Sequence, residues 1–131
     1  MKIIYTAIQL TDSRKDILDF AKLTFGELYN KVYCDHITLN FYNKTNLYKD
    51  GEFNIGEVVK FNIIGFVLDD NAQVFVCETN QKCMNKFPHI TISTKENIEP
   101  KYSNFLLDGK EYTKIKPIES NGIIRNKIYW F

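Results

Sequence analysis

Histidine exchanges protons near neutral pH, because its ordinary pKa is about 6.5, and this chain contains only two histidines, His36 and His89. Each is followed by an apolar residue, a threonine and a second apolar residue. At this composition a histidine is followed by such a triplet about 2% of the time, so the repetition indicates a shared role. The two segments are Asp35-His36-Ile37-Thr38-Leu39 and Pro88-His89-Ile90-Thr91-Ile92.

Both segments have the character of strands, in which alternate side chains share a face. His36 and Thr38 would then point away from the core into a cleft, and His89 and Thr91 would do the same. Two imidazoles and two hydroxyls suit a phosphodiester. A neutral imidazole accepts a proton from water or a ribose hydroxyl, and a protonated imidazole donates one to the leaving oxygen. The threonines would donate hydrogen bonds to phosphate oxygens, and which histidine is the base stays open.

Further contacts are weaker expectations. Ser93, on the face expected for Thr91, extends the anion site or faces solvent, and Tyr5 stacks on a base or packs in the core. Lys44, Lys86 and Lys95 lie near the motifs in sequence and would attract phosphate. A solvated surface role is the favoured interpretation for each lysine.

A metal site is the competing chemistry, because the chain has three cysteines, Cys34, Cys77 and Cys83. Zinc sites favour two cysteines two to four residues apart, and that spacing is missing here. Cys34 as a nucleophile would lack a third, orienting group. We therefore expect no metal and no cofactor. An odd number of cysteines without an export signal predicts reduced thiols and a cytoplasmic protein.

The elements that would position these residues are mostly strands. A helix begins at Asp12 or Ser13 and ends near Gly26, and a shorter one begins at Pro100 and runs through Leu107. The polar residues 43–51, which follow the strand expected over 32–42, predict a surface loop. The expected fold class is α+β. The strands are expected over residues 2–10, 32–42, 57–68, 73–79, 88–94, 112–118 and 123–131.

Length and charge limit the kind of partner. The chain of 131 residues predicts a single domain over 1–131. Its net charge of +1 argues against coating long nucleic acid and favours a small nucleotide or an RNA end. No apolar run is long enough to predict a membrane span. The oligomeric state stays open.

The paired His-x-Thr motifs resemble those of the two-histidine (2H) phosphoesterase superfamily, which includes RNA cyclic phosphodiesterases and viral cyclic-oligonucleotide hydrolases. Residues 88–94, followed by 100–107, look most like the phosphodiesterase domains of eukaryotic-type tRNA ligases and related viral enzymes. The resemblance implies two pseudo-symmetric β-rich lobes around a central groove. It also implies that His36 and His89 are the acid–base pair and that Thr38 and Thr91 anchor the phosphate.

Together these observations predict a metal-independent phosphodiesterase. Its substrate would be an RNA 2′,3′-cyclic phosphate end or a small cyclic nucleotide or oligonucleotide. A non-catalytic nucleotide or RNA-end binding module with the same cleft is the alternative, and a structural protein with incidental histidines is a weaker one.

Overall fold

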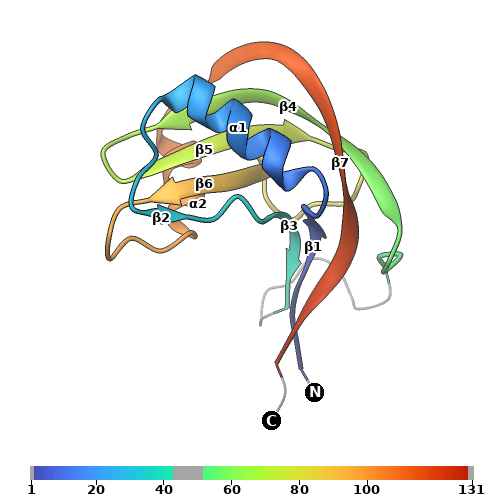
Figure 1. Cartoon of the computed structure of the whole chain (residues 1–131). Helices are drawn as coiled ribbons and strands as arrows, with labels where there is room; N and C mark the ends of the chain where they lie inside the picture. The colour runs from blue at the N-terminus through green and yellow to red at the C-terminus, as the bar shows by residue number, and fades with distance from the viewer. Residues whose placement is uncertain (1, 43–51, 130–131) are drawn as a thin grey trace.

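The computed structural model describes residues 2–42 and 52–129, which form a sheet-dominated α+β fold (Figure 1). The predicted fold class is therefore confirmed, with strands and helices close to the expected places. In chain order these are β1 (Lys2–Gln9), α1 (Arg14–Phe25), β2 (Lys31–Val32), β3 (His36–Phe41), β4 (Val58–Leu68), β5 (Ala72–Glu78), β6 (His89–Thr94), α2 (Tyr102–Gly109) and β7 (Thr113–Tyr129).

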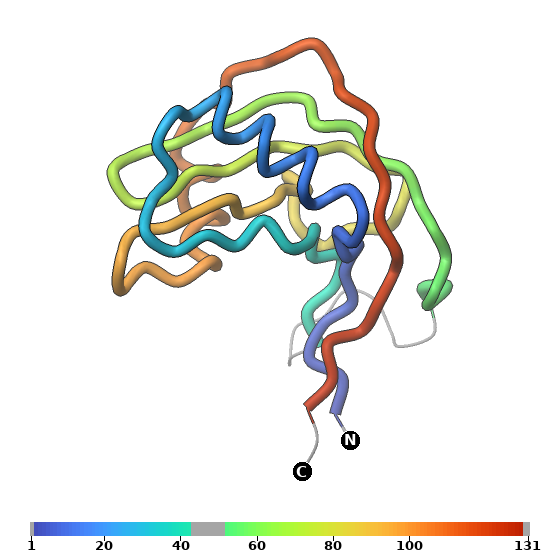
Figure 2. Tube along the Cα trace, in the orientation of Figure 1, coloured from blue at the N-terminus to red at the C-terminus, as the bar shows by residue number. Residues whose placement is uncertain are grey.

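All strand pairs of the sheet are antiparallel, in the order β2-β6-β3-β1-β7-β4-β5. A further ladder joins β5 back to β6, so that six strands form a closed ring and β2 continues the edge occupied by β3. β1, β3 and β7 run together down one side of the molecule (Figure 2). The first and last strands of the chain are therefore neighbours.

The helix α1 forms where apolar residues recur at helical spacing, and it buries Ile17 and Ala21. The Ser13 hydroxyl does not cap the helix but donates a hydrogen bond to the Asn121 carbonyl at 2.7 Å. Gly26 ends the helix in a backbone conformation with φ of 74°, which glycine adopts without steric cost. The predicted start and end of this helix are confirmed.

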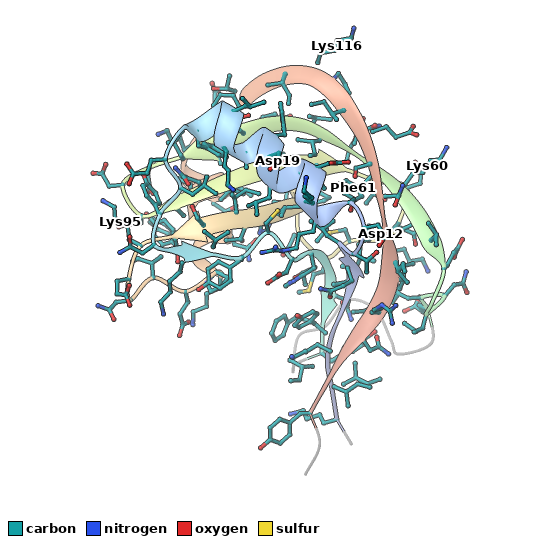
Figure 3. All side chains as sticks on the ribbon, in the orientation of Figure 1. Asp12, Asp19, Lys60, Phe61, Lys95 and Lys116 are labelled. Atoms are coloured by element: carbon teal, nitrogen blue, oxygen red, sulfur yellow. The ribbon has the colours of Figure 1, made fainter. Side chains whose placement is uncertain are left out.

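The two helices pack on opposite faces of the sheet. On β5, Phe75 belongs to the main core with α1, whereas Val74 and Val76 belong to a second cluster with Leu106 and Leu107 of α2. Phe61 of the main core lies beside α1, and Lys60 and Lys116 point outward (Figure 3). No helix within residues 2–42 and 52–129 is long and apolar enough to cross a membrane.

Two predicted strand boundaries are wrong. Residues 32–42 form two short strands because the chain turns between them, with Cys34 at φ of 51°. The strands expected at 112–118 and 123–131 are one strand, β7. Its turn-like residues Ser120 and Gly122 stay extended because both remain paired with β4. The loop predicted over 43–51 lies outside the described residues.

Candidate active site

The two His-x-Thr motifs lie side by side, because β3 and β6 pair at Ile37 and Ile90. Both isoleucines are fully buried in the main core. The residues on either side of this pair must therefore point to the opposite face, where α2 packs. Continuing the antiparallel register places each histidine across from the threonine of the other motif. The histidines are then diagonal neighbours, a relation in which the two Cα atoms lie about 7–8 Å apart.

The same irregularity follows the threonine in both motifs. The β1–β3 register skips Leu39, after Thr38, and the β5–β6 register skips Ile92, after Thr91. An extra residue of this kind is a β-bulge, which changes the face taken by the residues after it. Both bulged residues are buried in the main core, so the alternation of side chains holds up to each of them and breaks at the residue that follows.

The bulge at Ile92 moves Ser93 away from the expected position. Ser93 is fully buried, donates a hydrogen bond to the Gln73 side chain and accepts one from the Tyr29 backbone at 3.1 Å. Gln73 in turn donates to the Glu27 carbonyl, in the segment that follows α1. The expectation that Ser93 and Thr91 share a face is wrong, and Ser93 does not line the cleft.

A pocket of about 480 Å³ contains the four motif side chains. His36, Thr38, His89 and Thr91 all line it, and so does Tyr5. The pocket opens on the α2 side of the sheet. The four side chains that the alternation of strand residues predicted to share a face therefore share one pocket. The remaining wall is formed by Tyr33, Asp35, Phe41, Met84, Asn85, Pro100, Lys101 and Asn104.

His36 lies under an aromatic ring. The Tyr5 ring stacks on the imidazole, with the ring centroids 4.9 Å apart and the planes 20° apart. Burial lowers the pKa of His36 from its ordinary value, and the positive charges of His89 and Lys127 lower it further, against the opposing effect of Asp35.

His89 is oriented by the backbone just before it. Its Nδ1 lies 2.8 Å from the Phe87 carbonyl oxygen. Because a carbonyl oxygen only accepts hydrogen bonds, Nδ1 carries the proton and Nε2 is the nitrogen that exchanges protons with a ligand. Burial lowers the pKa of His89, while the bond to Phe87 opposes that shift. The neutral form is thereby favoured at neutral pH.

The threonine hydroxyls differ in their surroundings. Thr91 Oγ1 lies 2.7 Å from the hydroxyl of Ser103, a fully buried residue of α2, and 3.4 Å from the Pro100 carbonyl oxygen. The contact with Pro100 is long for an O–H···O bond. Thr91 can therefore accept from Ser103 and give its own proton to a closer anion in the pocket.

The segment between β5 and β6 is fixed against β3. The Met84 backbone donates to the Leu39 carbonyl at 2.8 Å, and the Cys83 thiol contacts the Thr38 carbonyl at 3.4 Å. This attachment makes Met84 and Asn85 a wall of the pocket. Periodicity within the segment gives no sign of it, because the contact depends on pairing between distant strands.

Polar residues that no sequence motif indicates also reach the site from other elements. Lys101 and Asn104 line the pocket from the start of α2. Lys127 of β7 is paired across the sheet with Tyr5, so it faces the same side. Each is separated from the motifs in sequence. The position of α2 beside the site follows from the hydrogen bond between Thr91 and Ser103, which the sequence does not indicate.

The cysteines do not form a site. Burial raises the pKa of Cys34 to about 11, so its thiol is protonated at neutral pH and is a poor nucleophile. Cys77 is fully buried in the core. In the described part of the chain, no three histidine, cysteine or acidic side chains are grouped so that they could hold a metal ion.

The antiparallel sheet and the paired His-x-Thr motifs facing one pocket define the class of two-histidine phosphoesterases. A family model described as the fungal tRNA ligase phosphodiesterase domain matches residues 25–128, a span that includes both motifs. The chain therefore belongs to this family, which is one of the two-histidine phosphoesterases. Comparison with curated proteins and with solved structures gave no match.

Proposed function

We propose that this chain is a phosphodiesterase that hydrolyses the 2′,3′-cyclic phosphate at an RNA end, with His36 and His89 as its acid–base pair. The observation that carries the proposal is the single pocket lined by both histidines and both threonines. Membership of a family described as tRNA ligase phosphodiesterase domains supports the activity and favours an RNA end as the substrate.

In the proposed reaction, water attacks the phosphorus atom of the cyclic phosphate. One imidazole, in its neutral form, takes a proton from this water. The other, in its protonated form, gives a proton to the ribose oxygen that leaves phosphorus. The product is a phosphomonoester with one free ribose hydroxyl, and each histidine ends with the protonation state that the other had at the start.

The threonines would stabilise the phosphate while the bonds change. Hydroxyl donors aimed at the non-bridging oxygens lower the barrier most where negative charge develops. Thr38 and Thr91 lie across the strands from His89 and His36, beside the place where one phosphate would touch both rings. We propose no metal, because two imidazoles already supply both proton transfers.

The wider architecture of the proposal is a single domain over 1–131 with two pseudo-symmetric lobes, each contributing one motif. The matching bulges after Thr38 and Thr91 support it. The residues after the two bulges, Asn40 and Ser93, are likewise both fully buried. Such a repeat would make the two halves of the cleft equivalent in geometry and different only in the ligand groups that they meet.

The proposal is tested with an RNA oligonucleotide that ends in a 2′,3′-cyclic phosphate, incubated with the purified protein in EDTA. We expect conversion to a phosphomonoester end at an unchanged rate in the chelator. The same oligonucleotide with a 3′-hydroxyl end is the control. Strong inhibition by EDTA that added metal reverses would contradict the metal-free mechanism.

Cyclic dinucleotides and trinucleotides are assayed in parallel, because the same acid–base pair would suit their phosphodiesters. Turnover of these compounds without turnover of the RNA end would reassign the substrate. Tight binding of the RNA end with no product would show a binding module in place of an enzyme.

A further inference from the structure

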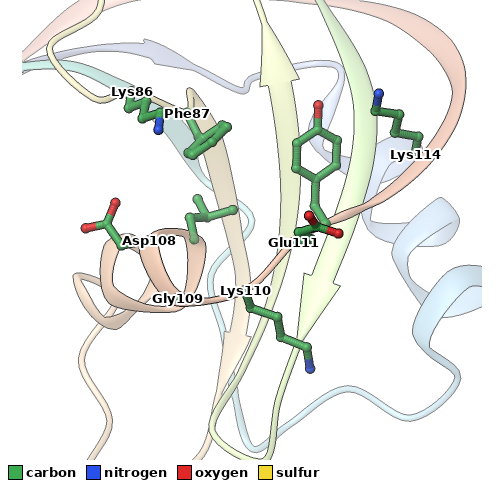
Figure 4. A pocket seen from close by; sticks show the side chains of 9 residues that line it. Lys86, Phe87, Asp108, Gly109, Lys110, Glu111 and Lys114 are labelled. Carbon is green, nitrogen blue, oxygen red and sulfur yellow. The ribbon is translucent and has the colours of Figure 1, made fainter.

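A second pocket, of about 530 Å³, lies beside the end of α2 (Figure 4). Phe87 and Tyr112 form its aromatic part, with ring centroids 6.1 Å apart and planes at 73°. Both rings are partly buried against the α2 cluster. A half-buried aromatic pair with space in front of it presents a surface on which a nucleobase can stack.

Positive charge lies beside these rings. Lys86 Nζ lies over the Phe87 ring, 5.3 Å from its centre, so a base that stacks on this face would move the exposed lysine side chain toward its phosphate. In the view of Figure 4, Phe87 lies between Lys86 and Lys114. Both lysine side chains are exposed. An aromatic surface flanked by lysines is the arrangement with which proteins hold single-stranded nucleic acid, because it suits a base and the phosphate next to it.

The other charged residues of the pocket restrict where a phosphate would lie. Lys110 points away from the rings and donates to the Leu68 carbonyl at 2.8 Å (Figure 4). Asp108 and Glu111 also line the pocket and would repel a phosphate. A nucleic acid would therefore place one phosphate at Lys86 and the next one at Lys114, on the two sides of the rings.

The two pockets share one segment of chain. Met84, Asn85 and His89 line the active-site pocket, whereas Lys86 and Phe87 line the second pocket. Phe87 is two residues from His89, so their Cα atoms are at most about 7 Å apart. The Phe87 carbonyl also holds the His89 ring. A nucleotide adjacent to one at His89 would reach the second pocket.

We infer that the second pocket binds the nucleotide of an RNA strand that neighbours the reacting end, with its base against Phe87 and Tyr112 and the phosphates on its two sides at Lys86 and at Lys114. This inference rests on the proposed function. It makes the preferred substrate an oligonucleotide rather than a cyclic mononucleotide, because a mononucleotide would leave this pocket empty.

The test compares two substrates, a 2′,3′-cyclic mononucleotide and a short RNA with the same cyclic end. In the double variant Lys86→Gln/Lys114→Gln we expect kcat/KM for the RNA to fall about tenfold. The slope of log kcat/KM against log salt concentration should become shallower by about 1.4, because two phosphate contacts are lost. The kcat/KM value for the mononucleotide should change less than about twofold. Lys15→Gln/Lys22→Gln removes the same charge from α1, on the opposite face, and should leave both substrates unaffected.

A second measurement separates this inference from the proposed function. Binding of a fluorescent RNA ending in a 3′-phosphate is followed by anisotropy for the wild type and both double variants. Loss of affinity in Lys86→Gln/Lys114→Gln alone supports the subsite, even if no RNA is turned over and the proposed function fails. Equal binding by all three proteins, or equal loss in kcat/KM for both substrates, would overturn the subsite.

Discussion

His36 and His89 both lie where burial disfavours a positive charge, and the charge of His89 adds to that effect at His36. In each case the pKa is lowered from the ordinary value of about 6.5. In the proposed reaction, proton transfer by the pair requires one ring neutral and the other protonated, so both pKa values would limit the rate. The surroundings would therefore set the pH range of the proposed activity.

We predict a bell-shaped pH profile of kcat/KM with its maximum on the acidic side of 6.5. The limb at low pH reports the base and the limb at high pH reports the acid of the free enzyme. Because burial lowers both pKa values, both limbs move to lower pH. The profile is measured on the cyclic-phosphate RNA across pH 4 to 9, and a maximum well above 7 would contradict this account.

Tyr5 affects the site through its contact with His36. The ring contributes to the burial that lowers the pKa of that histidine. In Tyr5→Ala we expect the pKa of His36 to rise toward its ordinary value, measured by NMR titration of the imidazole signals. Tyr5→Phe keeps the ring and is the control, with little change expected. An unchanged titration in Tyr5→Ala would show that the stacking does not shield His36.

The shared orientation of the four motif side chains was predictable because it is a local property of a strand. His36 with Thr38, and His89 with Thr91, need only the two-residue alternation of β structure. The predicted orientation of Ser93 was wrong for a non-local reason, because it depends on how β6 pairs with β5. The shared pocket supports the candidate roles, and the proposed assays test them.

At the scale of elements, the end of β1 supports β3 at the candidate site. Gln9 is paired with His36 across the two strands, and its side chain donates to the Asp35 carbonyl at 3.3 Å. On its other side, β1 lies against β7 near Gly122. A methyl group at Gly122 would come within 2.6 Å of the Gln9 carbonyl oxygen. The position thus requires a residue without a side chain.

We predict that Gly122→Ala destabilises the protein by about 1–3 kcal/mol, because the Gln9 backbone that the methyl group would meet is held in the sheet and cannot move without breaking strand pairing. The same shift would displace Gln9 and with it His36, so kcat/KM should also fall. Stability is measured by urea unfolding. Gly109→Ala is the matched control, since a methyl group there meets nothing within 4 Å. Equal stability of the two variants would contradict the close packing of β1 on β7.

The elements themselves were largely predictable, and the exceptions have structural causes. Helix α1 and the β4–β5 hairpin follow local patterns and formed where expected. In the hairpin, Asp69 Oδ1 accepts from the backbone of Asn71 and of Ala72, which fixes the turn. The continuous strand β7 was missed because its extended form depends on partners on both sides, β1 and β4.

At the scale of the whole molecule, closure of the sheet brings the motifs together. β6 pairs with β5 along one edge and with β2 and β3 along the other, so the ring joins segments from both halves of the chain. Hydrophobic patterning predicts which residues are buried, but not which strand lies beside which. That His36 and His89 line the same pocket therefore follows from the strand order and not from the sequence pattern.

In the proposed mechanism, His36 and His89 act as one unit on one phosphate. It is tested most directly by kcat/KM for cyclic-phosphate RNA in His36→Asn, His89→Asn and the double variant, with thermal unfolding as the control for folding. Asparagine at 89 can still donate to the Phe87 carbonyl.

We predict a loss of about 10²–10⁴-fold in each single variant. The double variant should be about as slow as the slower single variant, because groups that act as a unit do not add. Near-wild-type activity in either folded single variant, or losses that multiply in the double variant, would contradict the claim.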